Sequence, residues 1–289
     1  MFEAMIYILR TGIPWRDLPA RFGPWGSVYT RWRRWCQRGL WARLLQVLSR
    51  RAKGCLRFLD ASHIKVHQDG SNAAGGQQNQ AIGRTKGGLN TKVSAWVDGL
   101  GRAVSLSLAP GQHADVCVAQ TSPRPNLRGM ITVADKGYDS DSFREQLRRW
   151  GSQVCIPGRC NRRTAVTWHR GFYRRRHKVE NLFQRLKRYR RIGTRYDKCD
   201  LYFLSFVQLA AVLDWLKNQF CKHRLGGSES VKPIAGGQWQ CNFILQVVKI
   251  QRWLIRHVRP VRRGQIRTLL QHKIGRRNDP SNDEVGREK

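Results

Sequence analysis

Apolar residues recur at helical spacing through the N-terminal part of the chain. Residues 2–11 form an apolar-periodic run that ends at Gly12, a residue that commonly stops helices. Residues 27–52 interleave tryptophans with arginines. Aromatic residues at this spacing usually pack into a core, whereas arginines on the other face suit phosphate groups. The pattern predicts a helical region over residues 1–52, either a small helix-turn-helix-like module or a plain packing unit.

After Gly54 the apolar residues recur at every second position, which is typical of β-strands. The pattern predicts, in chain order, a strand at 55–67, a hairpin at 91–111, and strands at 130–135 and 152–158. Helices are predicted at 140–150, around Glu180 and at 201–220. This order indicates a mixed α/β sheet flanked by helices over residues 53–222. From residue 223 to 289 we expect a linker and a basic, helical or disordered extension.

The charge of the chain narrows its partners. It has 289 residues, with 54 Lys and Arg against 19 Asp and Glu, a net charge of +35. The basic residues are spread along most of the sequence, which favours a nucleic-acid partner over an acidic membrane surface.

Other composition features exclude several classes of protein. The eight cysteines include no C-x-x-C pair and fit no common zinc spacing, so we expect free thiols in a reducing cytosol. The N-terminus carries no secretory signal pattern. The apolar window 201–220 contains Gln208, Asp214 and Lys217, which favours a buried helix over a membrane span. We therefore expect a cytoplasmic protein.

Glu180 is the only acidic residue between Gln146 and Tyr196, and residues 170–195 hold eleven Arg and Lys. At about 100° per residue, a helix brings Tyr173, Arg176, Glu180 and Lys187 into a stripe of roughly 60°. Two cations beside a carboxylate keep it ionised and could hold phosphates on either side of a metal ion. The alternative is an ordinary ion pair between Arg176 and Glu180 on a solvated helix.

Two further carboxylates, Asp60 and Asp135, lie at the ends of predicted strands. Strand-end carboxylates point into the crevice of an α/β sheet. With Glu180 they make a set of oxygen ligands that suits magnesium and two-metal phosphoryl transfer. The pattern alone is weak, because a chain with 19 acidic residues contains many such triples.

The spacing Y-x2-R-x3-E-x6-K, at Tyr173, Arg176, Glu180 and Lys187, resembles the motif of the DDE transposases of bacterial insertion sequences. Several stretches resemble one branch, the insertion-sequence-five family, and run in its order over about residues 2–217. They are ILRTGIPWRDLPARFGPWGSVYTRWRRW, AIGRTKGGLNTKVSAWVDGLG, VADKGYDSD, RRHKVENLFQRLKRYRRIGTRYDK and FVQLAAVLDWL.

The resemblance implies an RNase H-like fold with a mixed five-stranded sheet. It implies that Asp60, Asp135 and Glu180 are the catalytic, metal-binding triad, holding two Mg²⁺ or Mn²⁺ ions. Activated water would cut the element's ends, and the exposed 3′ hydroxyls would attack target DNA. The implied partners are the terminal inverted repeats and target DNA, bound by a homodimer associated with the bacterial nucleoid.

Further residues are expected to contact DNA. By resemblance these are Tyr173, Arg176 and Lys187. Residues 83–88 resemble the family's basic glycine loop, in which Arg84 and Lys86 suit a phosphate, although a plain flexible loop is the alternative. The remaining candidates are Lys136, Arg31 and Arg34.

The chain departs from the family pattern at both ends. It starts inside the segment that matches the family's N-terminal domain, so residues 1–52 are expected to be a shortened DNA-binding region. Residues beyond about 226 match nothing in the family. Three functions stay open: an active metal-dependent transposase, a truncated and inactive DNA-binding relative that interferes with the full-length enzyme, and a stand-alone RNase H-like nuclease.

Overall fold

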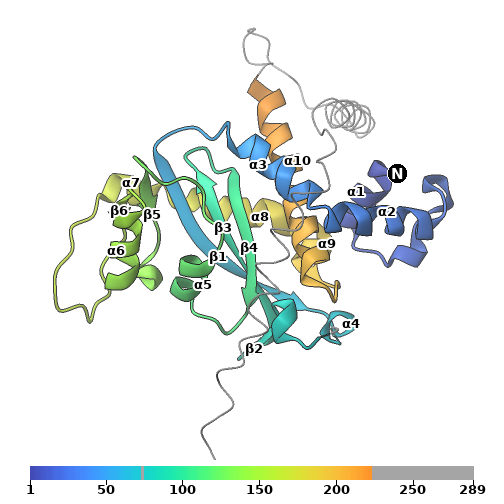
Figure 1. Cartoon of the computed structure of the whole chain (residues 1–289), viewed down its shortest axis with the longest axis horizontal. Coiled ribbons are helices and arrows are strands. Elements are labelled where there is room, and N and C mark those ends of the chain that lie inside the picture. Colours follow the sequence, from blue (N-terminus) through green and yellow to red (C-terminus); the bar gives the residue numbers. More distant parts are fainter. Residues whose placement is uncertain (73–74, 223–289) are drawn as a thin grey trace, which may run out of the picture. The chain divides into compact units, whose positions relative to one another are not determined.

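The computed structural model describes residues 1–72 and 75–222. The predictions for residues 223–289 lie outside this part of the chain. Within it, no helix is both long and apolar enough to cross a membrane. The N-terminal helices and the sheet belong to one compact unit (Figure 1).

A mixed sheet of seven strands forms the centre of this unit. Its strands are β1 (Leu56–Val66), β2 (Gly83–Thr85), β3 (Gly88–Asp98), β4 (Ala103–Pro110), β5 (Ile131–Val133), β6 (Gln153–Cys155) and β7 (Thr194–Arg195). β1 and β3 are antiparallel, from Arg57 opposite Asp98 to Lys65 opposite Asn90. β5 is parallel to both β1 and β6. The predicted mixed α/β class is confirmed.

The count of seven differs from the expected five because two edges are each shared by two strands. β2 and β4 pair one after the other along the edge of β3 that faces away from β1. β5 and β7 likewise share the edge of β1 that faces away from β3. The sheet is therefore five strands wide, and the short strands β2 and β7 are too brief to give a period-two signal.

The shared edge of β1 leaves a gap that matters for the site. β5 pairs with Leu56–Phe58 and β7 with Lys65–Val66, so residues 59–64 have no strand partner on that side. The side chains of a strand point alternately to its two faces. Leu59 and Trp96 face a core cluster with Tyr138, and Asp60 therefore points to the opposite face.

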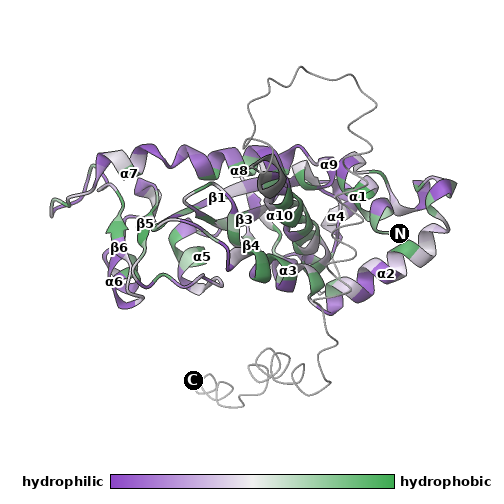
Figure 2. Ribbon diagram, turned by 90° about the horizontal axis from the view of Figure 1, so that it is seen from above, coloured by the Kyte–Doolittle hydropathy of each residue, from purple (hydrophilic) through white to green (hydrophobic). Residues whose placement is uncertain are grey.

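Helices cover the sheet according to this alternation. The core cluster of Leu59 includes Ala119 of α5 (Asp115–Thr121), and Phe143 and Leu147 of α6 (Asp141–Arg149). Helix α8 (His177–Lys187) contacts β1 and β3, and α10 (Asp200–Lys222) contacts β4 (Figure 2). The remaining helical elements are α4 (Gln68–Ser71), η3 (Gln78–Gln80), η4 (Lys136–Tyr138), α7 (Arg170–Arg174) and α9 (Arg190–Gly193).

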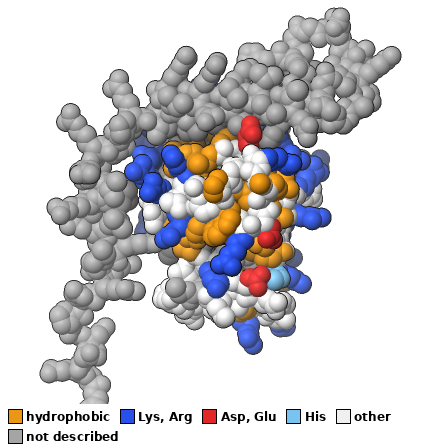
Figure 3. Space-filling view, turned by 90° about the vertical axis from the view of Figure 1, so that its right-hand side faces the viewer, with side chains coloured by type: hydrophobic (Ala, Val, Ile, Leu, Met, Phe, Trp, Pro, Cys, Tyr) orange, Lys and Arg blue, Asp and Glu red, His pale blue; other side chains and the backbone are white. Residues whose placement is uncertain are grey.

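The N-terminal region is helical, as predicted. It comprises α1 (Phe2–Thr11), η1 (Trp15–Asp17), η2 (Ala20–Phe22), α2 (Trp25–Gln37) and α3 (Leu40–Ser49). Trp32 and Trp41 are fully buried, and Trp32 stacks on Phe206 of α10 with ring centroids 4.0 Å apart. The tryptophans therefore belong to the core that joins these helices to α10. Arg31 and Arg34 are exposed, and Figure 3 shows Lys and Arg side chains around the rim of this part of the molecule.

Candidate active site

Asp60 lies in the gap on β1 between β5 and β7. Its side chain is only 17% exposed, and its Oδ1 accepts a hydrogen bond of 2.8 Å from the Ala61 amide. Burial raises the pKa of Asp60 to about 6, although the Ala61 amide and the Arg176 guanidinium oppose this shift. Asp135 and Asp115 add to the increase, so these carboxylates share one electrostatic environment with Asp60.

Asp135 follows β5 and caps the short helix η4. Its Oδ1 accepts a hydrogen bond of 2.8 Å from the Gly137 amide. A Cβ atom at residue 137 would lie 2.9 Å from this oxygen, so glycine permits the close approach. Because β5 runs parallel to β1, the chain leaves β5 in the direction that carries β1 through Asp60. The predicted strand-end position of Asp135 is therefore found.

Arg176 connects the third carboxylate to the first. Its Nη1 donates to Asp60 Oδ2 at 2.9 Å, and its Nη2 donates to Glu180 Oε1. Asp60 and Glu180 are thus bridged by one guanidinium, although they belong to a strand and a helix far apart in the sequence. The ion pair between Arg176 and Glu180 was foreseen as the ordinary alternative, and the structure adds Asp60 to it.

The sequence pattern placed Tyr173, Arg176, Glu180 and Lys187 on one continuous helix, but the structure divides this segment into α7 and α8. The helix is interrupted at residues 175–176, where the Arg176 amide donates to Tyr173 O at 2.9 Å and the Val179 amide donates to Arg176 O at 3.0 Å. These bonds span three residues instead of four, so the rotation of α7 is not continued in α8. Tyr173 lies on α7, with its ring edge-on to Trp168 at 5.0 Å. Its expected DNA contact stays a prediction.

Lys187 lies at the other end of α8, away from the carboxylates. Its Nζ donates to His63 O at 3.0 Å, on the part of β1 without a strand partner. Desolvation lowers the pKa of Lys187. The helix therefore contacts β1 with Arg176 near Asp60 and with Lys187 near His63.

Two residues beside the carboxylates were not foreseen from the sequence. Tyr138 is fully buried in the core cluster, and its hydroxyl has no hydrogen-bond partner in the described part of the chain. Burial raises the pKa of Tyr138, and the charges of Asp115, Asp60 and Asp135 raise it further. Asp115 pairs with the buried Lys92 at 2.5 Å. Tyr138 stands in the same short motif as Asp135, which could have drawn attention to it.

The remaining DNA-binding candidates are exposed, and only Lys136 among them adjoins a carboxylate in the sequence. Arg84 and Lys86 occupy the tip of the β2–β3 hairpin, so the expected glycine loop is a strand turn. Lys136 follows Asp135 directly, and its carbonyl accepts a hydrogen bond from Arg159 Nε at 3.1 Å. Their contacts with DNA stay predictions.

The carboxylates suit a divalent cation in chemistry. Asp60, Asp135 and Glu180 offer only hard oxygen donors, and the charge of Asp135 helps to raise the pKa of Asp60, an effect that a nearby cation opposes. As they stand, the residues described contain no group of three His, Cys, Asp or Glu close enough to hold an ion. The cation between Asp60 and Glu180 is the guanidinium of Arg176.

Two family models match the chain. Residues 1–45 match the family described as "Putative transposase of IS4/5 family", and residues 132–217 match "Transposase DDE domain". The second match covers Asp135 and Glu180, and it implies the RNase H-like form of the mixed sheet.

One similar protein that the chain covers in full supports the same assignment. The chain is 34% identical over 134 residues to a "Putative transposase for insertion sequence element IS6501" from Brucella ovis, covering 45% of this chain and all of the relative. It is 36% identical over 84 residues to an uncharacterized 16.2 kDa protein of insertion element IS402 from Burkholderia cepacia, covering 28% of this chain and 54% of the relative. A piggyBac transposase synaptic complex with hairpin DNA aligns over 82% of this chain and 59% of its own, with 10% identity and a TM-score of 0.36, too low to support an argument.

Proposed function

Because the chain belongs to the DDE transposases of bacterial insertion sequences, in the IS4/5 group, we propose that it cuts DNA at the ends of its element and joins the exposed 3′ hydroxyls to target DNA. One observation carries the proposal. Arg176 bonds both Asp60 of β1 and Glu180 of α8, and the charge of Asp135 raises the pKa of Asp60, which supports a shared role for the three carboxylates.

Asp60, Asp135 and Glu180 would hold divalent cations, Mg²⁺ or Mn²⁺, and the family's chemistry suggests two ions. A bound ion supplies positive charge to the reacting phosphate and lowers the pKa of a water molecule. The cost of ionising the buried Asp60 is then offset by the cation, as it is now by Arg176.

The residues of the chain have separate tasks in this proposal. Arg176 holds the two carboxylates in register before the ion and DNA bind, and its guanidinium can then turn to a phosphate oxygen, which suits its planar geometry. Lys187, anchored on His63 O, would fix a neighbouring phosphate. Lys136 is exposed next to Asp135 and would neutralise another. No covalent protein intermediate is needed, because the attacking groups are water and a DNA hydroxyl.

The partners proposed are the terminal inverted repeats and the target DNA, bound by a dimer that brings two ends together. The net charge of +35 supports a polyanionic partner.

The test uses the purified full chain and a supercoiled plasmid that carries the terminal repeats of the element. We expect nicking and strand transfer in Mg²⁺, and neither in EDTA. Cleavage of any duplex without joining would instead assign a stand-alone nuclease. Salt-sensitive DNA binding without cleavage in Mg²⁺ or Mn²⁺ would contradict the enzyme and leave a DNA-binding relative.

A further inference from the structure

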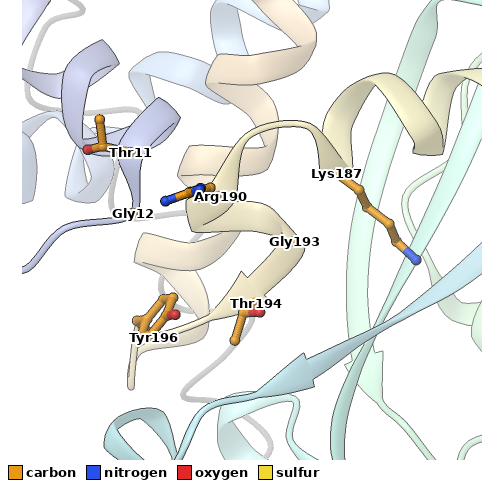
Figure 4. Close-up of a pocket in the computed structure, with 7 residues that line it drawn as sticks. All are labelled: Thr11, Gly12, Lys187, Arg190, Gly193, Thr194 and Tyr196. Atoms are coloured by element: carbon orange, nitrogen blue, oxygen red, sulfur yellow. The ribbon is translucent and has the colours of Figure 1, made fainter.

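A cavity of about 460 Å³ lies beside the C-terminal end of β1 (Figure 4). One wall is the end of α1, with Thr11 and Gly12. The other wall comes from the segment that follows α8. Its lining residues are Lys187, Arg190, Gly193, Thr194 and Tyr196. A cavity of this size falls in the range that holds small ligands or parts of larger ones.

The lining has the chemistry of an anion site. It contains two cations, Lys187 and Arg190, and no acidic side chain. Arg190 is exposed, and its guanidinium has no partner among the residues that the structure describes. The hydroxyls of Thr194 and Tyr196 also make no hydrogen bond within that part of the chain. Three donors are therefore available to a ligand that accepts hydrogen bonds and carries negative charge.

The two walls are held together by contacts behind the cavity. Arg191 forms a buried bidentate pair with Asp197, at 3.0 and 2.7 Å, and its Nη1 donates to Ile13 O at 3.2 Å. Gly12 has a φ of 73°, and a Cβ atom there would lie 3.1 Å from Arg190 Cβ. The end of α1 thus approaches α9 closely, and the site exists without rearrangement, which lowers the entropic cost of binding.

The cavity has a defined position relative to Asp60. Thr194 on β7 pairs with Lys65 of β1, five residues beyond Asp60. At about 3.3 Å per residue, the two positions are separated by about 17 Å along the strand. This separation is about half of the 34–36 Å of one helical turn of duplex DNA, so one duplex can contact both places.

We propose that this cavity binds a phosphodiester of the DNA backbone within one helical turn of the bond that is cut, held by Arg190, Thr194 and Tyr196 and framed by the end of α1. The assignment of the distance rests on the proposed function, because it takes Asp60 as the point of cleavage. The site gives the N-terminal helices a direct part in positioning DNA on the catalytic sheet.

The first arm of the experiment measures DNA binding and does not depend on cleavage. The affinity of the full chain for a fluorescent duplex is measured by anisotropy over a series of salt concentrations. Arg190→Ala is compared with Arg148→Ala, which removes from α6 an exposed cation whose side chain has no partner among the described residues. We expect Arg190→Ala to weaken binding several-fold and to reduce the salt slope by about one unit. Equal, small effects of both variants would overturn the proposal.

A second variant removes a hydrogen bond without removing charge. Tyr196→Phe deletes one oxygen, so we expect weaker binding with an unchanged salt slope. Thermal unfolding of each variant, compared with wild type, separates loss of the site from loss of the fold. Wild-type affinity for Tyr196→Phe together with wild-type affinity for Arg190→Ala would exclude a phosphate in the cavity.

The second arm locates the phosphate. Duplexes of the element's end carry a single neutral methylphosphonate, moved one position at a time away from the cleavage site. Wild type should lose affinity most at one position within a helical turn of the cleavage site, whereas Arg190→Ala should be insensitive there. If the methylphosphonate lowers the affinity of wild type at no such position, or if the variant shows the same sensitivity, the assignment is contradicted. If a mononucleotide binds the cavity while duplex binding ignores Arg190, the site serves a free nucleotide and the proposal fails.

The two arms keep this inference separate from the proposed function. A changed salt slope for Arg190→Ala with no cleavage by wild type would support phosphate binding in the cavity and contradict the proposed transposase activity. Cleavage by wild type with an unaltered slope for Arg190→Ala would do the opposite.

Discussion

Two places along β1 meet opposite kinds of side chain, an acidic one at Asp60 in the middle of the strand and a basic one at its C-terminal end. At Asp60 the neighbours are Asp135 and Glu180, joined by a single guanidinium. At Lys65 the neighbours are β7 and a cavity lined by Lys187 and Arg190, with no carboxylate. Both places suit phosphates, but in different ways. The reacting phosphate needs metal ions, which carboxylates can hold, whereas the other phosphates need only the cationic side chains of the protein.

Helix α8 serves both places. Arg176, just before its first turn, bonds Asp60, and Lys187, in its last turn, bonds His63 O. Its buried residues Val179, Leu182, Phe183 and Leu186 face the protein interior. One amphipathic helix thus fixes the distance between the acidic site and the basic site. The isolation of Glu180 in a basic segment follows from this, since only one end of the helix requires an anion.

The largest effect is expected at the acidic site. Asp60→Asn, Asp135→Asn and Glu180→Gln should each lower cleavage by more than about 100-fold, because even outer-shell changes at metal sites cost about 10–100-fold. DNA affinity should stay close to wild type in each, since the phosphates are held elsewhere. Single-turnover cleavage and anisotropy on the same duplex measure the two effects. A variant that keeps wild-type cleavage would remove its residue from the site.

Arg176→Ala should have the next largest effect, on stability as well as on activity. Its guanidinium makes hydrogen bonds to two carboxylates, and such charged bonds contribute about 1.5–3 kcal/mol when buried. Because Glu180 is half exposed, we expect a total loss of roughly 1–3 kcal/mol in the free energy of unfolding without divalent ions. Denaturant titration measures this loss. Arg175→Ala, an exposed neighbour with no partner in the described chain, is the matched control. Equal stability of the two variants would refute the bridge.

The sequence predicted the acidic site better than the basic one. The contact between Arg176 and Glu180 is local, so helix spacing was sufficient to foresee it. Asp135 follows the end of β5, as predicted, but the strand-end position predicted for Asp60 is wrong, because β1 continues past it to Val66. The interruption at residues 175–176 was missed, because no glycine or proline stands at residues 172–179 to mark it. The bond from Arg176 to Asp60 depends on tertiary packing, which the spacing of residues along a helix does not predict.

The basic cavity could not be predicted for a related reason. Its walls come from Thr11 and from Arg190, which are far apart in the sequence, and β7 is too short to show a strand pattern. The places of Tyr138 and Asp115 beside the carboxylates also depend on contacts between distant segments. Sequence periodicity therefore predicted the elements, the family resemblance pointed to the three carboxylates, and only the packing shows the neighbours of each.

A smaller effect is expected for Lys187→Ala. Its ammonium is anchored on His63 O but remains at the surface, so the variant should lose a few-fold in DNA affinity. The salt slope should fall by about one unit. Measurements of the binding constant between low and physiological salt report this slope. If the slope matches that of wild type, Lys187 does not contact a phosphate.

The smallest effect is expected at the hairpin tip. Arg84→Ala combined with Lys86→Ala removes two exposed charges from the β2–β3 turn. We expect a modest loss of affinity, smaller than that of Arg190→Ala, because a hairpin tip holds a phosphate less rigidly than a framed cavity. The double variant Arg148→Ala and Arg149→Ala on α6 removes the same charge. A loss no greater than that of the α6 variant would leave the hairpin without a DNA contact.

The division of tasks along β1 is tested most directly by one measurement: the rate at which bound DNA is cut at saturating protein in Mg²⁺. Asp60→Asn should bind with wild-type affinity and cut none of the bound DNA. Arg190→Ala should need more protein to saturate and should then cut at close to the wild-type rate, as expected for a residue that contributes to binding alone. Cleavage by Asp60→Asn, or a cutting rate for Arg190→Ala that stays low at saturation, would contradict the account.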